Sequence, residues 1–235
     1  MDRLIINCDL GEDEPLDFTE QLLGLIDAAN IGCGFHAGNP TKTEATLRKA
    51  VRYKLRIGAH PGLPSEGGRG DALPTVREFS ALLDEQIESF QRSAQAVGAQ
   101  IDYIKLHGTL YHAVETESDL ASAYLDCLES MLPGIAVFAL AQGAFAERAA
   151  ARGVQVYHEA FFDRAYHDKG QLVARSMPGA VLGAEVALKR FRAWKMSGAL
   201  ATASGESIRL SADTLCVHAD SPDALEMIRS LRRIS

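Results

Sequence analysis

The chain has 235 residues, of which 47% are hydrophobic, and its formal net charge at pH 7 is −7. This length and apolar content suit one barrel-sized domain, which we expect to span residues 1–235. No apolar run approaches the roughly 18–20 residues of a membrane span, and no basic stripe marks a nucleic-acid surface. We therefore expect neither a membrane nor a nucleic acid as a partner.

The cysteines and the first residues indicate a cytoplasmic protein. Cys8, Cys33, Cys127 and Cys216 form no C-x-x-C pair, which favours reduced thiols. The first four residues lead directly into an apolar stretch without a signal-peptide pattern. We interpret the thiols as small buried residues, with a nucleophilic Cys8, Cys33 or Cys216 as the alternative.

Apolar stretches and helical patterns alternate along the first half of the chain. Two predicted helices begin at capping boxes, Thr41-x-x-Glu44 and Thr75-x-x-Glu78, and the second ends at Gly98. Residues 61–74 hold four glycines and three prolines, so they form a long loop. The predicted strands are 4–7, 29–33, 56–60 and 101–106, and the predicted helices are 18–28, 41–54 and 75–98.

The same alternation continues to the end of the chain. Residues 161–178 are predicted to form a long polar loop. Repeated strand-then-helix units predict a mostly parallel sheet, and their number favours a closed or nearly closed barrel. The predicted strands are 135–140, 154–158, 207–210 and 215–217, and the predicted helices are 120–131, 145–152, 183–196 and 222–233.

Titratable side chains end five of the short apolar stretches. In a (β/α) barrel the loops that follow the strands share one face. We therefore expect one polar site at the rim of a barrel, rather than unrelated capping or core histidines. The stretches end in His36, His60, His107, His218 and, for the first of them, the carboxylates Asp9 and Glu12.

Carboxylates, imidazoles and a lysine at one rim are the parts of a hydrolase. A carboxylate can activate water, a histidine can carry protons, and a cation can stabilise an oxyanion. Asp9, His36 and His60 could also hold one divalent metal with an open position for water. No H-E-x-x-H spacing is present, so a metal-free, hydrogen-bonded set is the alternative.

Two further features bear on charge and on nucleotides. Lys105 lies in an apolar run, so a buried ammonium there needs a partner. The adjacent Asp163 and Arg164 form either a loop ion pair or part of an anion site.

Residues 67–70 are rich in glycine, but no G-x-x-x-x-G-K-[ST] and no strand-borne G-x-G-x-x-G is present. We expect no standard ATP motif, and we interpret this loop as a mobile lid.

Five sequence blocks carry a family resemblance. The first two are long and specific, and the matching region runs from Asn7 to Asp220. Together the blocks resemble the signature of the LamB/YcsF family. They read NCDLGE at 7–12, ANIGCGFHAG at 29–38, GAHP at 58–61, KLHGTLY at 105–111 and EAFFDRAY at 159–166.

The resemblance implies a seven-stranded or irregular TIM-like (β/α) barrel with mostly parallel strands, distantly related to deacetylase-like hydrolases. It implies ATP-dependent opening of 5-oxoproline (pyroglutamate), a cyclic amide, to L-glutamate by a multi-subunit complex with B and C subunits. It implies catalytic roles for Asp9, His36, His60, Lys105 and His107, and substrate-binding roles for Asn7, Glu12, Arg69, Asp163 and Arg164.

In the expected mechanism Asp9 positions or deprotonates the attacking water, and the histidines of the second and third blocks assist directly or through a metal. Lys105 stabilises the amide oxygen, and His107 protonates the leaving nitrogen. Arg69 or Arg164 pairs with the substrate carboxylate. The alternatives are a stand-alone, metal-dependent deacetylase or amidohydrolase for a linear N-acyl substrate, and a non-catalytic, metabolite-binding subunit.

The chain departs from the family pattern near the expected site. The family usually has Asp where Asn39 stands, Pro where Leu106 stands and Asn where His112 stands. The loop at 67–70 reads Gly-Gly-Arg-Gly where the family has Phe-Gly-Arg-Arg. These changes alter the rim and the lid loop, so they bear on the substrate more than on the fold.

Overall fold

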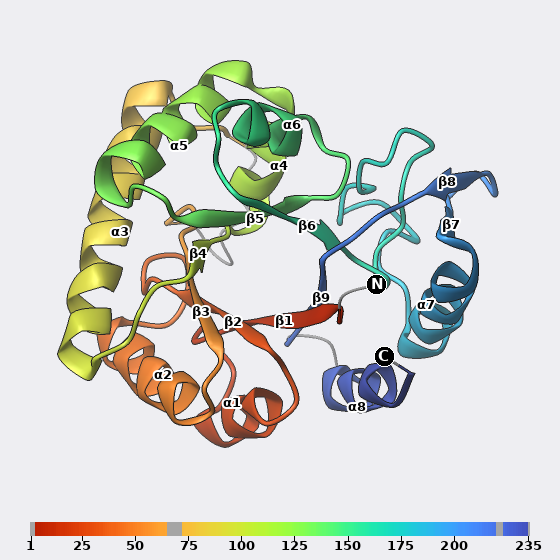
Figure 1. Cartoon of the computed structure of the whole chain (residues 1–235), viewed down its shortest axis with the longest axis horizontal. Coiled ribbons are helices and arrows are strands. Elements are labelled where there is room, and N and C mark those ends of the chain that lie inside the picture. The colour runs from red at the N-terminus through yellow and green to blue at the C-terminus, as the bar shows by residue number, and fades with distance from the viewer. Residues whose placement is uncertain (1–2, 65–71, 220–222, 235) are drawn as a thin grey trace.

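The computed structural model describes residues 3–64, 72–219 and 223–234. The described residues form a closed barrel of seven parallel strands, in the order β1-β2-β3-β4-β5-β6-β9 (Figure 1). The parallel barrel predicted from the strand-then-helix order is confirmed. The strands are β1 (Ile5–Leu10), β2 (Ala28–Gly32), β3 (Arg56–His60), β4 (Tyr103–Ile104), β5 (Ala136–Leu140), β6 (Val156–Ala160) and β9 (Thr214–His218).

Helices lie around the outside of the barrel, and an antiparallel hairpin of β7 and β8 lies beside α7, away from the barrel strands (Figure 1). No helix of the described residues is long and apolar enough to cross a membrane. The hairpin strands are β7 (Ala199–Ala201) and β8 (Ser207–Arg209). The helices are α1 (Leu16–Leu23), α2 (Pro40–Arg52), α3 (Val76–Val97), α4 (Gly108–Thr116), α5 (Ser118–Met131), α6 (Ala144–Ala151), α7 (Ala184–Ser197) and α8 (Ala224–Ile234).

Helix α3 follows its sequence signals closely. The Thr75 hydroxyl accepts from the backbone N–H of Glu78, and the Glu78 carboxylate accepts from the backbone N–H of Thr75. Gly98 ends the helix in the left-handed conformation, with φ of 70°. The predicted capping box and helix end are both confirmed, because they depend on local chemistry alone.

Helices α1 and α2 differ from prediction at their ends. The N-cap of α2 is Asn39, whose side chain accepts from the Lys42 N–H, and not Thr41. Pro40 occupies the first helical position, which suits a residue that has no N–H to donate. Helix α1 ends at Leu23, and the predicted last residue, Ala28, belongs to β2.

Helix α4 and strand β7 were not predicted from the sequence. Helix α4 begins directly after His107, which makes no side-chain cap, so no start signal is present. The strand predicted at 207–210 exists, but it pairs with β7 and contributes nothing to the barrel. The barrel is closed by β9 alone, which pairs with both β1 and β6.

A tyrosine fills the barrel beneath the polar residues. The ring of Tyr103 stacks on Phe138 with centroids 3.7 Å apart, and its hydroxyl donates to Asn30 Oδ1 at 2.6 Å. Gly58 on the neighbouring strand leaves the space for this ring, because a Cβ there would fall on the ring atoms of Tyr103. The glycine on β3 therefore permits the hydrogen bond between Tyr103 on β4 and Asn30 on β2.

We predict that Gly58→Ala lowers the free energy of unfolding by about 1–3 kcal/mol, because the added methyl overpacks Tyr103. The matched control is Gly24→Ala. A Cβ at Gly24 would lie 3.7 Å from Tyr53, an ordinary contact, so its effect should stay below about 1 kcal/mol. Urea unfolding of both variants checks this. Equal losses of unfolding free energy in the two variants would show that the Tyr103 ring moves aside without cost.

Candidate active site

Asp9 lies at the centre of the polar rim. Asn7 and Asp9 are two residues apart on β1, so both side chains point to the same face, the barrel interior. Asp9 Oδ1 accepts from Lys105 Nζ at 2.8 Å and from Asn30 Nδ2 at 2.7 Å. The site is buried, since Lys105 is only 2% exposed. This geometry fixes Oδ1 and turns Oδ2 toward His60, 3.5 Å from its Nε2.

A chain of buried amides supports this arrangement from below. Asn30 Nδ2 also donates to Asn7 Oδ1 at 2.7 Å, and Asn30 Oδ1 accepts from Tyr103. Asn7 Nδ2 donates to Glu159 Oε1 at 2.8 Å and to Thr214 Oγ1 at 2.7 Å. The orientation of each amide is thereby set by its neighbours. Asn7 contacts Asn30 and Glu159, and it is fully buried beneath the rim.

Opposite charges offset the burial of Lys105. Its Nζ lies 3.3 Å from Glu159 Oε1 and 3.1 Å from Cys216 Sγ, in addition to Asp9. Burial alone would lower the pKa of Lys105, but Asp9 holds it well above its usual range. Burial would raise the pKa of Asp9, but the ammonium of Lys105 holds it well below its usual range. For Glu159, burial raises the pKa. Asp9 and Lys105 therefore face each other as ions.

His60 presents an unprotonated nitrogen to Asp9. Its Nδ1 lies 2.7 Å from the backbone oxygen of Lys105, and a carbonyl oxygen only accepts, so Nδ1 carries the proton. The remaining nitrogen, Nε2, faces Asp9 and lies 2.9 Å from His107 Nδ1. Burial lowers the pKa of His60 to about 4, so the ring is neutral near pH 7.

Glu12 joins two further histidines on the same side of the site. Its Oε1 lies 3.1 Å from His36 Nε2 and 3.1 Å from His107 Nδ1. The His36 ring stacks on His107 with centroids 4.1 Å apart. A Cβ at Gly62 would press on His36 Nδ1 at 2.7 Å. Burial would raise the pKa of Glu12, but the two histidines hold it well below its usual range.

A second histidine–carboxylate pair lies on the opposite side of Asp9. His218 Nδ1 is 2.9 Å from Asp163 Oδ2, and the Phe161 ring lies against the imidazole, with centroids 5.8 Å apart. Burial would lower the pKa of His218, but Asp163 raises it above its usual value. Burial would raise the pKa of Asp163, but His218 lowers it.

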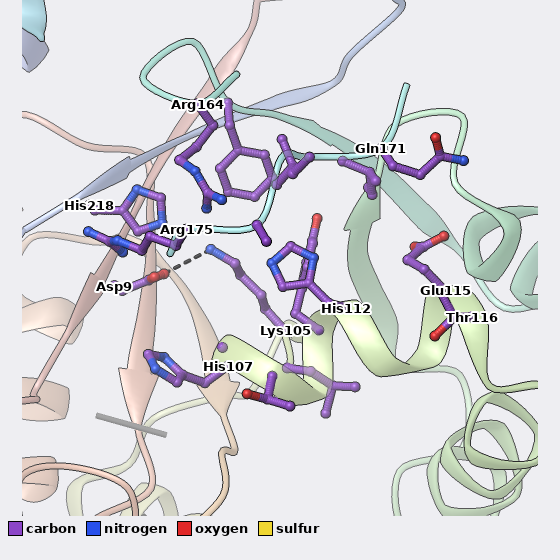
Figure 2. Close-up of a pocket in the computed structure, with 18 of the residues that line it drawn as sticks. Asp9, Lys105, His107, His112, Glu115, Thr116, Arg164, Gln171, Arg175 and His218 are labelled. Atoms are coloured by element: carbon purple, nitrogen blue, oxygen red, sulfur yellow. Dashed lines mark hydrogen bonds and ion pairs between the residues drawn. The ribbon is translucent and has the colours of Figure 1, made fainter. Parts of the chain in front are cut away.

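A cavity of about 570 Å³ opens above these groups. Figure 2 shows Asp9 and Lys105 joined at one side, with His218, Arg164 and Arg175 near them and His112 and Glu115 on α4 further along the cavity. The guanidinium of Arg164 donates to the backbone oxygens of Val173 at 2.7 Å and Ala180 at 3.3 Å. Arg164 therefore holds the loop after β6 as well as lining the cavity.

The predicted site residues differ in where they lie relative to the cavity. Glu12 and His36 lie beside the cavity in the histidine cluster, Asp163 lies behind His218, and Asn7 lies in the amide chain. Arg69 and its glycine-rich loop lie outside the described residues. The predicted residues that line the cavity are Asp9, His60, Lys105, His107 and Arg164.

Several residues that shape the site had no role predicted from the sequence. Asn30 is a polar residue within an apolar stretch, and that contrast was the available signal. Tyr103 is two residues before Lys105, and so on the same side of the strand. Arg175 and Glu115 line the cavity from the loop after β6 and from α4. No local pattern indicated these last two.

The predicted metal ligands are only partly brought together. Three sets among the described residues have ligand atoms within 4.8 Å of one another, and one of them is Asp9, His60 and His107. The predicted set of Asp9, His36 and His60 is not among them, because His36 lies beyond Glu12, stacked on His107. The set of Asp9, His60 and His107 fits a divalent metal. The Nδ1 of His60 donates to a backbone carbonyl, so its Nε2 is the nitrogen that would bind the metal.

Comparison with known proteins gives a consistent family. The LamB/YcsF family model matches residues 4–234. The chain is 37% identical over 240 residues to a 5-oxoprolinase A subunit of Pseudomonas syringae pv. tomato, covering 100% of this chain and 94% of that protein. It is 34% identical over 236 residues to the 5-oxoprolinase A subunit of Heliobacterium modesticaldum, covering 98% and 93%.

A solved structure agrees with this result. The crystal structure of the lactam utilization protein from Thermus thermophilus superposes with a TM-score of 0.87 at 31% identity, covering 98% of this chain and 95% of that one. A more distant likeness, to a protein from Agrobacterium tumefaciens at 12% identity and a TM-score of 0.56, reflects the fold alone.

The histidines on the two sides of Asp9, His60 and His218, should titrate at different pH values in metal-free protein. We predict that His60 titrates near pH 4, because burial lowers its pKa to about 4, and that His218 titrates above its usual value of 6.5. NMR of the ring protons measures this, with assignments from His60→Gln and His218→Asn. Both rings titrating together near 6.5 would contradict it.

The pKa shifts of His60 and His218 also decide how the folding stability changes with pH. Between pH 6.5 and about 4 the unfolded chain binds a proton at residue 60 that the folded chain refuses, so stability falls as the pH falls through that window. The contribution of His218 is complete below 6.5 and is lost as the pH rises through its raised folded pKa.

Proposed function

The chain belongs to the LamB/YcsF family, and on this premise we propose that it is the A subunit of a 5-oxoprolinase. It would act as a hydrolase that opens the lactam ring of 5-oxo-L-proline to L-glutamate. The observation that carries the proposal is an ionised Asp9 held against Lys105 on the wall of a cavity at the carboxyl ends of the strands. The family relatives and the lactam utilization protein supply the substrate class.

Asp9 and His60 would activate the attacking water. Oδ1 of Asp9 is occupied by Lys105 and Asn30, so Oδ2 is the oxygen turned toward His60 and its unprotonated Nε2. A water held between these acceptors would lose its proton to one of them as it attacks the carbonyl carbon. His107, Glu12 and His36 would position His60 and carry protons away, since they follow it in a connected chain of contacts.

Lys105 would stabilise the amide oxygen through its charge. Its Nζ already contacts Asp9, Glu159 and Cys216, so a direct hydrogen bond to the substrate would compete with these groups. In a buried site, however, a fixed positive charge acts on a developing oxyanion without direct contact. Lys105 also keeps Asp9 ionised, which the attack on the carbonyl requires.

The substrate carboxylate would bind the arginine wall. Arg164 is fixed by the carbonyls of its own loop, and a guanidinium that is already in place can donate to a carboxylate with little loss of side-chain freedom. Arg69, also predicted to bind the carboxylate, lies outside the described residues. Asn7, Glu12 and Asp163 would act on the substrate through the neighbours that they orient.

ATP would be handled with B and C subunits in the cytoplasm. Ring closure of glutamate is strongly favoured, because the tethered amine has an effective molarity of up to about 10⁵–10⁸ M. A hydrolase cannot change that equilibrium, and the sequence has no Walker-type loop. The chain would therefore open a lactam whose hydrolysis is coupled to ATP on the partner subunits.

The second candidate is a stand-alone, metal-dependent amidohydrolase or deacetylase for a linear N-acyl group. The observation that favours it is the set of Asp9, His60 and His107, which has the residue types of a catalytic metal centre. A divalent metal bound there would lower the pKa of a bound water. The same set is compatible with the lactam hydrolase, so the two candidates differ in the need for ATP and partners.

The decisive test is to incubate the chain with 5-oxo-L-proline and Mg-ATP, with and without the B and C subunits, and to measure glutamate and ADP. We expect both products only when the partners are present. ATP-independent glutamate release by the chain alone would favour the stand-alone amidohydrolase. Tight substrate binding without turnover, even with partners, would indicate a non-catalytic binding subunit.

The matched variant for this assay is Asp9→Asn, which keeps the size of the side chain and removes its charge. We expect turnover to fall by at least about 10²-fold, as for loss of a general acid–base group. Thermal unfolding of the variant checks that the chain still folds. Near-normal turnover would remove Asp9 from the mechanism.

Elemental analysis tests the metal. If Asp9, His60 and His107 are ligands, purified protein should carry close to one divalent ion per chain, and His60→Ala should lose it. His36→Ala is the control, because it should retain the ion; its loss would point to a ligand set that contains His36, either the set predicted from the sequence or that of Glu12, His36 and His107. Metal-free protein with chelator-insensitive activity would leave the histidines as proton carriers.

A further inference from the structure

Opening an amide requires a proton on the departing nitrogen, because an amide anion is a very poor leaving group. The mechanism expected from the family resemblance assigns this proton to His107. The structure places His107 on the same side of Asp9 as His60, where the attacking water is proposed to bind; it lies 3.1 Å from Glu12 and 2.9 Å from His60. A donor to the nitrogen is better placed on the other side of the carbonyl carbon, away from the attacking water.

His218 occupies that other side. It stands opposite Asp9 on the neighbouring strand β9, and it lines the same cavity. Because its Nδ1 faces Asp163, Nε2 is the nitrogen left for the cavity. Figure 2 shows His218 beside Asp9 and across from His107, which lies on the other side of Asp9.

The ring of His218 is held in one orientation. Asp163 fixes Nδ1 at 2.9 Å, and Phe161 covers one face of the ring at an interplanar angle of 23°. Asp163 is itself 6% exposed, and its backbone oxygen accepts from Leu182 N at 2.8 Å. A carboxylate behind an imidazole fixes the tautomer and stabilises the protonated ring, which suits a proton donor.

We propose that His218 is the catalytic residue that protonates the leaving nitrogen, and that Asp163 is its positioning residue. This inference rests on the proposed lactam-opening function. The water oxygen bonds to the carbonyl carbon and gives its proton to Asp9 or His60. The carbon–nitrogen bond breaks, its electron pair goes to nitrogen, and nitrogen takes the proton from Nε2. The proton on the base then returns to His218 through solvent, so the step consumes one water.

The competing explanation is structural. The Asp163–His218 pair joins the loop after β6 to the end of β9, so it could serve only to brace the barrel where β9 closes it. The two roles differ in one respect. A proton donor matters only when the leaving group needs a proton, whereas a brace affects all substrates alike.

The test compares two leaving groups in the complete complex with B and C subunits and Mg-ATP. One substrate is 5-oxo-L-proline, and the other is the thiolactone in which sulfur replaces the ring nitrogen, whose thiolate departs unprotonated. For His218→Asn we expect kcat on the lactam to fall by at least about 10²-fold, with little change on the thiolactone. Asp163→Asn should show the same selectivity with a smaller loss. His158→Asn, on β6 outside the cavity lining, is the control.

Both rates are measured on one preparation, so their ratio is independent of the fraction of folded protein. Equal losses on both substrates would overturn the assignment and leave the pair as a brace. An unchanged lactam rate in His218→Asn would also overturn it. If the wild-type complex fails to open 5-oxo-L-proline, the proposed function itself is wrong. That outcome is separate from any result with the variants, because it is measured on the wild-type complex.

Discussion

The buried contact between Lys105 and Asp9 is the interaction on which the rest of the site depends. An ammonium that is 2% exposed is tolerated only beside compensating charge. Removing one partner of such a pair leaves an unpaired buried ion and typically costs about 3–5 kcal/mol. Since Asp9 comes from β1 and Lys105 follows β4, while Glu159 comes from β6, the ion cluster couples strands that are not neighbours in the barrel.

This contact also divides the work of one carboxylate between its two oxygens. Oδ1 accepts from Lys105 and Asn30 and is held in place, whereas Oδ2 faces His60 and is the oxygen proposed to act on water. Tyr103 donates to the side-chain oxygen of Asn30 and so turns the amide nitrogen of Asn30 toward Asp9. The anchoring therefore extends from the rim to the packed interior, where Gly58 makes room for the tyrosine ring.

Sequence reasoning recovered what is local or repetitive. The capping box of α3, the bounds of β3 and the alternation that leads to a parallel barrel all follow from short-range patterns. The grouping of strand-end residues followed from the barrel itself. What remained hidden depends on how distant segments meet. His36 reaches His107 only because the loop after β2 folds back across Gly62, and Asn30 gains its role from partners on β1 and β4. Likewise, only three-dimensional pairing reveals that β8 belongs to a separate hairpin.

The long excursion between β6 and β9 has a consequence for how this architecture can diversify. Residues 161–213 carry Asp163, Arg164 and Arg175 and lead into His218, whereas the side of Asp9 with His60 and His107 is built from segments between β1 and α4. The residues proposed to bind the substrate carboxylate and those proposed to activate water thus lie in separate parts of the sequence. Recombination between relatives with a crossover near β6 would exchange the wall of the cavity as a cassette while leaving the Asp9–Lys105 anchor intact. New substrates can arise by that route without rebuilding the Asp9–Lys105 contact, provided that the exchanged segment keeps the Asp163–His218 pair.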